Sequence, residues 1–293
     1  MFLPSLFIDV LIGGLILGLI YSLLAAGLNL QYGVTRMLNV AHGDFLMLGA
    51  YTTYFCFVLF GINPYVSLMI SGPMFFMVGV LINIGIFQRM IRLSRSAEEL
   101  EARSLLICFG LSYIIQNMAT ALWTANYKGY SAPLRETINI LGTAFELNRI
   151  LIAMISFAIN LVLYLFLRFT KLGLAMRAAV DQPEGAQLVG VDIYRIYSVS
   201  FGLGLLLSAW TGTLISTIYS INPYMGGPYT MMALLMIILA GIGSFIGNIV
   251  AGLIVGFAVY ITMRLIHSAL TLITIYAILV IVLLVRPRGL FRR

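Results

Sequence analysis

The most constraining feature of the sequence is a run of 68 residues, positions 196 to 263, without a single Asp, Glu, Lys or Arg. So long an uncharged stretch is stable only in hydrocarbon or in a fully buried core. A helix needs about 20 apolar residues to cross a bilayer, and backbone in lipid must be hydrogen-bonded within helices or closed barrels. The run is far too long for barrel strands, so it predicts membrane-spanning helices.

The composition agrees with an all-α fold, a polytopic membrane helix bundle with broken or re-entrant helices. Hydrophobic residues make up 61% of the chain and charged residues 9%. A net charge of +7 could indicate nucleic-acid binding, but 12 of the 17 Lys and Arg fall in three short segments, 88–103, 168–195 and 286–293. Because Lys and Arg accumulate in cytoplasmic loops, we interpret these segments as topology signals and expect no nucleic-acid partner.

The uncharged intervals predict about eight spans in a single transmembrane domain that covers residues 1–293. A Gly/Pro turn at 61–64 should divide the second interval into two crossings. The intervals lie at 10–34, 45–87, 104–125, 150–167, 196–221, 231–266 and 268–285, and the block 231–266 carries one charge, Arg264, near its end.

The sides on which the basic segments lie also constrain the number of membrane crossings. The basic loop at 168–195 and the basic tail that starts at Arg286 should both be cytoplasmic, which requires an even number of crossings between them. Three apolar blocks lie there, so the block 231–266 is expected to be a re-entrant hairpin or a pair of short crossings. The same reasoning places the N-terminus outside and the C-terminus in the cytoplasm.

The break in that block should fall between Gly241 and Gly247. Non-helical backbone at membrane depth is tolerated only where protein or a watery cavity satisfies it, and transporters build sites near the midplane from broken helices. We therefore expect Gly241, Gly243 and Ser244 to border a translocation pathway. The alternative is that these glycines only let helices pack closely, as small residues do in membranes.

A second unusual segment places Arg36, Asn39, His42 and Asp44 within nine positions between two apolar stretches. It could be an ordinary cytoplasmic turn. Polar and ionisable side chains near membrane depth are costly, however, and usually line a pathway, so we expect Asn39, His42 and Asp44 to border it. His42 and Asp44 are two residues apart and would point to different sides of a regular helix. Gly43 favours a helix start there, with Asp44 as an acid in its first turn.

The loop at 168–195 has features of a docking element. Pro183 is placed to open a short helix that ends at Gly190, with Glu184 in its first turn and Ala186 and Val189 toward one side. The alternative is a solvated connector between two spans. The sequence contains no G-x-x-x-x-G-K-[ST] phosphate loop, so the chain cannot hold ATP in that way.

Several of these segments also carry a resemblance. The chain resembles LivH-type permeases of branched-chain amino acid ABC importers over nearly its whole length. It departs from the family pattern at Val40, where the family usually has Phe, and at Asp44, where it usually has Glu. The matching motifs are Gly27-Leu-Asn-Leu-Gln-Tyr-Gly33, Asn39-Val-Ala-His-Gly-Asp44, Leu48-Gly-Ala-Tyr51, Glu184-Gly-Ala186-x3-Gly190, Ile221-Asn-Pro-Tyr224 and Ala240-Gly-Ile-Gly-Ser244.

The resemblance implies a multi-pass permease subunit of the inner (cytoplasmic) membrane that takes up amino acids, chiefly branched-chain ones, and is not an enzyme. Its implied partners are a second, related permease, two cytoplasmic ATPases and an extracytoplasmic solute-binding protein, with no cofactor or metal. It also implies that Glu184, Ala186 and Gly190 belong to the coupling helix that contacts the ATPase. The binding protein would dock on the external faces, including segment 126–149.

Other functions remain open on the sequence. An ATP-independent channel or facilitator for small polar solutes such as urea or amides would also be helical, but would not need a docking loop. A secondary transporter would bury more paired acids than these spans contain. An intramembrane enzyme is disfavoured because His42 and Asp44 have neither a second His at metal-binding spacing nor an activated nucleophile beside them. The permease sequence does not by itself identify the solute.

Overall fold

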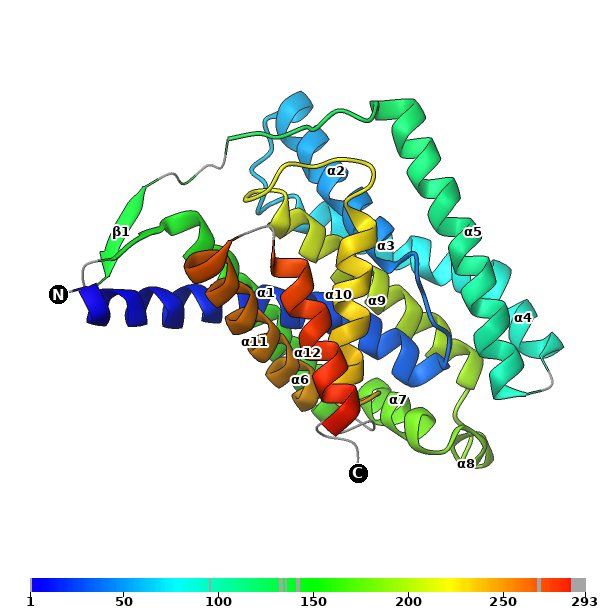
Figure 1. Ribbon diagram of the computed structural model, residues 1–293. Coiled ribbons are helices and arrows are strands. Elements are labelled where there is room, and N and C mark those ends of the chain that lie inside the picture. Colours follow the sequence, from blue (N-terminus) through cyan, green and yellow to red (C-terminus); the bar gives the residue numbers. More distant parts are fainter. Residues whose placement is uncertain are drawn as a thin grey trace.

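The computed structural model describes residues 2–94, 96–131, 134, 136–140, 143–267 and 270–285. Helices dominate it (Figure 1), with two single π-helical turns and one small antiparallel hairpin. The helices are α1 (Phe2–Thr35), α2 (His42–Phe60), α3 (Leu68–Ile82), α4 (Gln88–Leu93), α5 (Ala97–Trp123), α6 (Leu147–Phe169), α7 (Lys171–Asp181), α8 (Pro183–Leu188), α9 (Ile193–Ile215), α10 (Gly226–Ala240), α11 (Phe245–Ile261) and α12 (Thr271–Val285). The π-helical turns are Asn83–Phe87 and Thr262–Ile266, and the strands are β1 (Thr137–Ile140) and β2 (Thr143–Glu146).

Within the described residues, seven helices are long and apolar enough to cross a membrane, and α10 and the apolar part of α12 are shorter. This confirms the all-α, polytopic fold class. The turn expected at 61–64 is observed, because Gly61 ends α2 in a left-handed conformation with φ +65°. The break expected after Gly241 separates α10 from α11. The tail that begins at Arg286, on which the cytoplasmic placement of the C-terminus depends, lies outside the described residues.

Helix α9 lies at the centre of the bundle and α5 at its periphery. In the span formed by α9, 78% of the residues are buried, against 17% in α5, and in Figure 1 α5 stands at the edge of the molecule. Helices α1, α2 and α3 all pack against α9. Their approach is close because Gly204, Ser208 and Gly212 recur every fourth residue, and small residues at this spacing let helix backbones meet in membranes.

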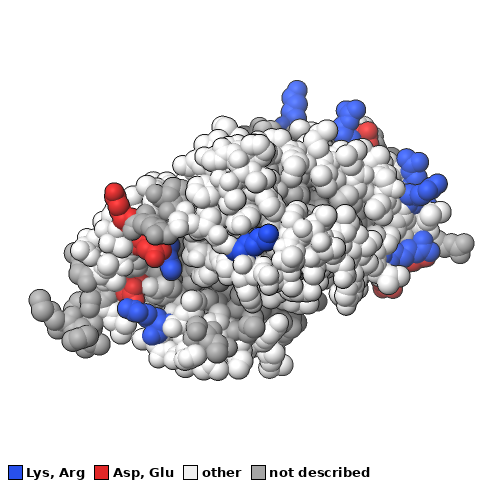
Figure 2. Space-filling model, turned by 90° about the horizontal axis from the view of Figure 1, so that it is seen from above, with Lys and Arg blue, Asp and Glu red and all other residues white. Residues whose placement is uncertain are grey.

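The segment that follows α5 and the segment that follows α9 lie together. Lys128 and Ile221 pair through their backbones, with N–H to carbonyl distances of 2.8 and 2.7 Å in the two directions. The hairpin of β1 and β2 follows in the same connection and was not predicted. On the face shown in Figure 2 most of the surface is uncharged; the acidic side chains lie toward its two ends, whereas Lys and Arg also lie near its middle and along one edge.

Candidate functional site

The segment expected to border a pathway connects α1 to α2 and lies inside the molecule. Asn39 and His42 are 0% exposed and Asp44 is 1% exposed. Helix α2 begins at His42, and Asp44 is the acid of its first turn, as predicted. This burial does not fit a solvated cytoplasmic turn, so these polar groups are held at depth among helices.

Asp44 lies where two helices begin. Its carboxylate accepts a hydrogen bond of 2.9 Å from Nε2 of Gln116 on α5. It also lies against Gly226, the first residue of α10, where an added Cβ would come within 2.5 Å of Asp44 Oδ1. The first turns of α2 and α10 are joined by Gly43 N–H, which donates to Thr230 Oγ1 at 2.8 Å. Helix N-termini carry partial positive charge, and the Asp44 carboxylate lies beside the N-terminal turns of both α2 and α10.

His42 and Asn39 face the opposite direction, toward α1 and α9. His42 Nε2 lies 3.4 Å from the carbonyl oxygen of Leu24, which can only accept, so this contact places a proton on Nε2. Asn39 Nδ2 donates to Gln31 Oε1 at 3.3 Å, and Gln31 Nε2 donates to the carbonyl of Phe201 at 3.0 Å. His42 Nδ1 and Asn39 Oδ1 are buried without a protein partner in the structure. As expected, His42 and Asp44 point to different sides of α2.

The break between α10 and α11 is stabilised by a single side chain of α1. Gly241 and Gly243 have φ of +86° and +79°, a conformation that side chains other than glycine rarely adopt. Asn29 accepts from Gly243 N–H at 2.8 Å and donates to the carbonyl of Ser244 at 3.1 Å. Ser244 Oγ then caps α11 by accepting from Gly247 N–H at 3.1 Å. Gly243 N–H, the Ser244 carbonyl and Gly247 N–H are thus hydrogen-bonded to protein side chains at the break.

The two predicted groups do not lie together. His42 and Asn39 contact α1 through Leu24 and Gln31, whereas the break contacts α1 through Asn29. At 3.6 residues per turn, Leu24 and Gln31 share one side of α1, and Asn29 lies far around from both. Helix α1 therefore stands between the two groups, and the sequence did not indicate this separation.

The loop at 168–195 forms the predicted short helix, with one correction. Pro183 opens α8, and Gly190 follows its end with φ +87°. Glu184 is exposed in the first turn, but Ala186 is only 4% exposed while Val189 is 80% exposed. The expectation that Ala186 and Val189 share one side was wrong, because α8 ends at Leu188 and the chain turns before Val189.

Four polar residues that position the site were missed from the sequence: Asn29, Gln31, Gln116 and Thr230. Each is a polar side chain within a predicted apolar span, and such residues usually have a partner or a pathway role. That signal was available in the sequence. The partners were not, because all but one of the bonds described above join segments far apart in the chain; the exception is the bond between Gln31 and Asn39. Within the described residues, no group of three or more His, Cys, Asp and Glu side chains is arranged to hold a metal ion.

Replacing Asn29 by leucine tests the support of the break. The change keeps the branched shape and the number of heavy side-chain atoms but leaves Gly243 N–H and the Ser244 carbonyl without partners, and each buried unsatisfied group costs about 1–3 kcal/mol. We expect a clearly lower melting temperature of the detergent-solubilised protein. The matched control is Asn117→Leu, because exposed Asn117 bonds only the carbonyl of Tyr113 on its own helix. Equal melting temperatures for the two variants would contradict the assigned role of Asn29.

Comparison with known proteins agrees with this architecture. The family model described as branched-chain amino acid transport system / permease component matches residues 10–283. The chain is 28% identical to the high-affinity branched-chain amino acid transport system permease protein LivH of Escherichia coli (strain K12), over 98% of this chain and 96% of the relative. It is 26% identical to the corresponding permease protein BraD of Pseudomonas aeruginosa, with the same coverage.

An archaeal relative is also similar. The probable branched-chain amino acid transport permease protein LivH of Methanocaldococcus jannaschii is 29% identical, over 84% of this chain and 78% of the relative. No solved structure matches the chain. Because the family match extends from α1 to α12, the chain is a multi-pass membrane protein that belongs to the family of branched-chain amino acid transport system permease components.

Proposed function

We propose that the chain is the permease subunit of an ABC importer that takes up amino acids, with branched-chain amino acids as its principal substrates. The relatives are named as branched-chain amino acid permeases, which supports this class of solute. The proposed partners are a second, related permease, two ATPase subunits and an extracytoplasmic solute-binding protein. The complex would reside in the cytoplasmic membrane, and the energy would come from the ATPases.

The observation that carries the proposal is the tip of α8. Leu188 is 90% exposed and Val189 is 80% exposed, although both lie in a loop between spans. Large apolar side chains next to each other in an exposed loop mark a protein contact. Ala186 is buried against the bundle and accepts the N–H of Val191 at 3.0 Å, so α8 is anchored on one side and free on the other. A helix held in this way suits docking on an ATPase subunit.

The structure also offers a route by which movement of α8 could reach the membrane interior. Helix α7 directly precedes α8, and its Val180 lies against the break, within 3.0 Å of the position a Cβ on Gly243 would take. Asn29 ties the break to α1, and the other side of α1 contacts His42. We infer that closure of the ATPases pushes α7 and α8 against the break between α10 and α11. This push moves α10 and α11 relative to α1. The movement then switches access to the pathway beside Asn39, His42 and Asp44.

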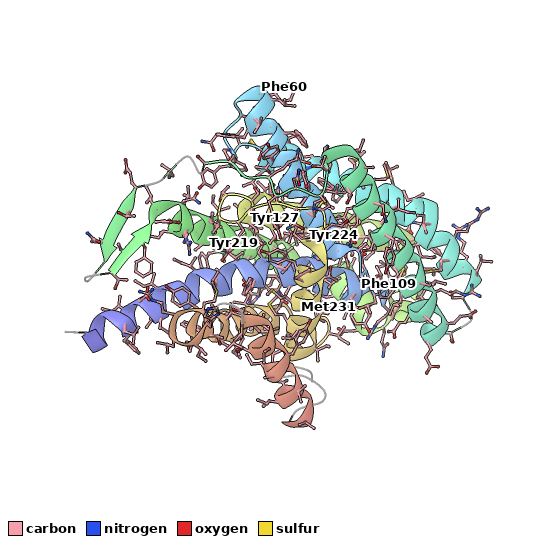
Figure 3. All side chains as sticks on the ribbon, turned by 45° about the horizontal axis from the view of Figure 1, so that its top comes forward. Phe60, Phe109, Tyr127, Tyr219, Tyr224 and Met231 are labelled. Carbon is pink, nitrogen blue, oxygen red and sulfur yellow. The ribbon has the colours of Figure 1, made fainter. Side chains whose placement is uncertain are left out.

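The solute-binding protein would dock at the opposite side. Phe60, Tyr127 and Tyr224 are strongly exposed. Phe60 is the last residue of α2. Tyr127 and Tyr224 lie in the two connections that are joined by the backbone pair of Lys128 and Ile221. Figure 3 shows Tyr127 and Tyr224 on the same side of the bundle, above α10 and beside α5, and Phe60 at the outer end of α2. Tyrosine and phenylalanine are enriched in protein interfaces, so these residues are candidates for that contact.

The double variant Leu188→Ser with Val189→Ser tests the proposal. We expect the ATPase subunits to be lost on affinity purification of the tagged permease, and uptake of leucine into proteoliposomes to fall with them. The matched control is Val58→Ser with Leu59→Ser, which removes two exposed apolar side chains from the other side of the molecule and leaves Phe60 in place. The control should retain the ATPases.

Two outcomes would contradict the proposal. One is unchanged ATPase binding by the Leu188 and Val189 variant. The other is rapid solute flux through the purified chain reconstituted without any ATPase, which would favour a facilitator for small polar solutes. Leucine, glutamine, urea and acetamide should all be assayed as solutes, because uptake of the amides rather than leucine would reassign the substrate class.

A further inference from the structure

A lateral cavity of about 700 Å³ lies between α1, α6 and α11. It is lined by α1 from Ile12 to Ser22, by α6 from Ile150 to Tyr164 and by α11 from Ile246 to Leu253. Several residues on its rim are exposed, among them Met154 and Phe157, so the cavity opens onto the surface that faces lipid. In Figure 1, α6 and α11 lie in the lower left of the view, away from α5 at its right edge.

The lining selects for a hydrocarbon chain. Of its fifteen residues, Ser22, Asn160 and Tyr164 carry polar groups and the others are apolar. Asn160 uses its Nδ2 within the protein, donating to Ser22 Oγ at 3.1 Å and to the Ser156 carbonyl at 2.9 Å. An unfilled apolar space forfeits the dispersion contacts of its walls, so in a bilayer a lipid chain is favoured over a void.

The dimensions fit one acyl chain. The cavity volume falls within the range of about 300–1,000 Å³ found for small-molecule sites. From Ile150 to Tyr164, α6 rises about 21 Å at 1.5 Å per residue. One leaflet contributes half of a hydrocarbon core that is about 30 Å thick, so the cavity is long enough for a chain that enters from one leaflet.

Cationic side chains gather at one end of the cavity. Arg168 lies one helical turn beyond Tyr164 and donates from Nη1 to the Tyr164 hydroxyl. Arg177 Nη2 donates to the Arg168 carbonyl at 3.3 Å, and Lys171 begins the next helix. The three ion pairs found within the described part of the chain involve other residues. Basic side chains at a membrane surface attract anionic lipids by about 1 kcal/mol each.

From this combination we propose that the cavity binds one acyl chain of an anionic phospholipid, whose headgroup is held by Arg168, Lys171 and Arg177. The site lies on the side of the bundle away from Asp44 and does not depend on which solute is transported. Two of the three headgroup contacts are on α7, which touches the α10–α11 break through Val180. A bound lipid would therefore stiffen α7 against α6.

Native mass spectrometry of the purified permease tests the site. The protein is delipidated in detergent and titrated with palmitoyl-oleoyl phosphatidylglycerol, with phosphatidylcholine of the same chains, and with palmitate. We expect one phosphatidylglycerol to be retained in preference to the other two. Ala153→Phe fills the cavity from α6 and should weaken this binding roughly tenfold or more, because a buried side chain of this size is worth about 1.5–3 kcal/mol.

The controls separate lipid binding from folding. Ala158→Phe makes the same change on an exposed position of α6 outside the cavity lining and should bind like the wild type. Arg168→Gln with Arg177→Gln should remove the preference for phosphatidylglycerol over phosphatidylcholine, while Lys128→Gln, on the other side of the membrane domain, should not. In the wild type, a phospholipid with a photoreactive acyl chain should label the α6 peptide that contains Met154 and Phe157.

Each alternative result is decisive. Equal binding of phosphatidylglycerol and phosphatidylcholine, or loss of binding in Ala158→Phe as well, would overturn the site. Palmitate binding as tight as phosphatidylglycerol would assign the cavity to free fatty acid instead. Labelling of a partner permease at Met154 and Phe157 in the assembled complex would show that a protein, not a lipid, covers it. These lipid-binding measurements do not depend on transport, so their results would stand even if the chain did not take up leucine.

Discussion

Gly212→Ala is expected to prevent α2 and α9 from packing and to abolish accumulation of folded permease. A Cβ added to Gly212 would lie 1.9 Å from the Leu46 carbonyl oxygen and 3.1 Å from the Ala50 nitrogen. Overpacking of side chains costs about 1–3 kcal/mol, and here the obstacle is backbone, which cannot change rotamer. The two helices must separate, and with them the contact of Ser208 with the His42 carbonyl at 2.6 Å.

The measurement is the yield of monodisperse protein and its melting temperature in detergent. Gly110→Ala is the matched control, because Gly110 is exposed on α5 with open space around it. Alanine is a better helix former than glycine, so Gly110→Ala should melt at the wild-type temperature or slightly above. A Gly212→Ala protein with wild-type yield and melting temperature would show that the α2–α9 contact is looser than the structure indicates.

Gly243→Val is expected to leave the protein folded but to uncouple transport from ATP hydrolysis. Valine is strongly disfavoured at φ +79°, and its Cβ would press on Val180 of α7 at 3.0 Å. Strain of this kind costs about 1–3 kcal/mol. If the break must move between two conformations, this bias should lower leucine uptake roughly tenfold, while basal ATPase activity of the assembled complex persists.

Two further variants distinguish coupling from simple strain. Gly61→Val places the same side chain at a similar φ of +65° in open space at the outer end of α2, and should lower stability without uncoupling. Val180→Ala removes the contact with the break without straining any backbone, and should reduce uptake per ATP hydrolysed. If Gly61→Val uncouples as strongly as Gly243→Val, or if Val180→Ala behaves as wild type, the relay through α7 is wrong.

Much of the fold could be predicted because membrane helices are encoded locally. The uncharged run from 196 to 263 required helices, and Gly61 and Gly241 marked helix ends that the structure confirms. Pro183 marked the start of α8 for the same reason, since a proline at the first helical position loses no hydrogen bond. The pair of β-strands was missed because each strand is only four residues long and lies in a connection between two spans.

Only part of the candidate site could be predicted from the sequence. The residues Asn39, His42 and Asp44 were identifiable as costly polar groups between apolar stretches, and their burial is confirmed. Their partners Gln31 and Gln116 were not identifiable, because Gln116 is 72 positions from Asp44 in the chain. The relation of Ala186 to Val189 was predicted wrongly, since the helix ends at Leu188, two residues before the predicted end at Gly190.

The sequence by itself determined that this chain lies in a membrane as a helical bundle, where its helices begin and break, and which family motifs it carries. These properties follow from hydrophobicity, glycine and proline, which act on neighbouring residues. The tertiary structure alone decided that α1 separates the His42 side from the Gly243 break, that α7 touches that break, and that a cavity opens between α6 and α11. Those relations depend on how distant helices cross, and crossing is set by side-chain packing between segments that the sequence does not pair.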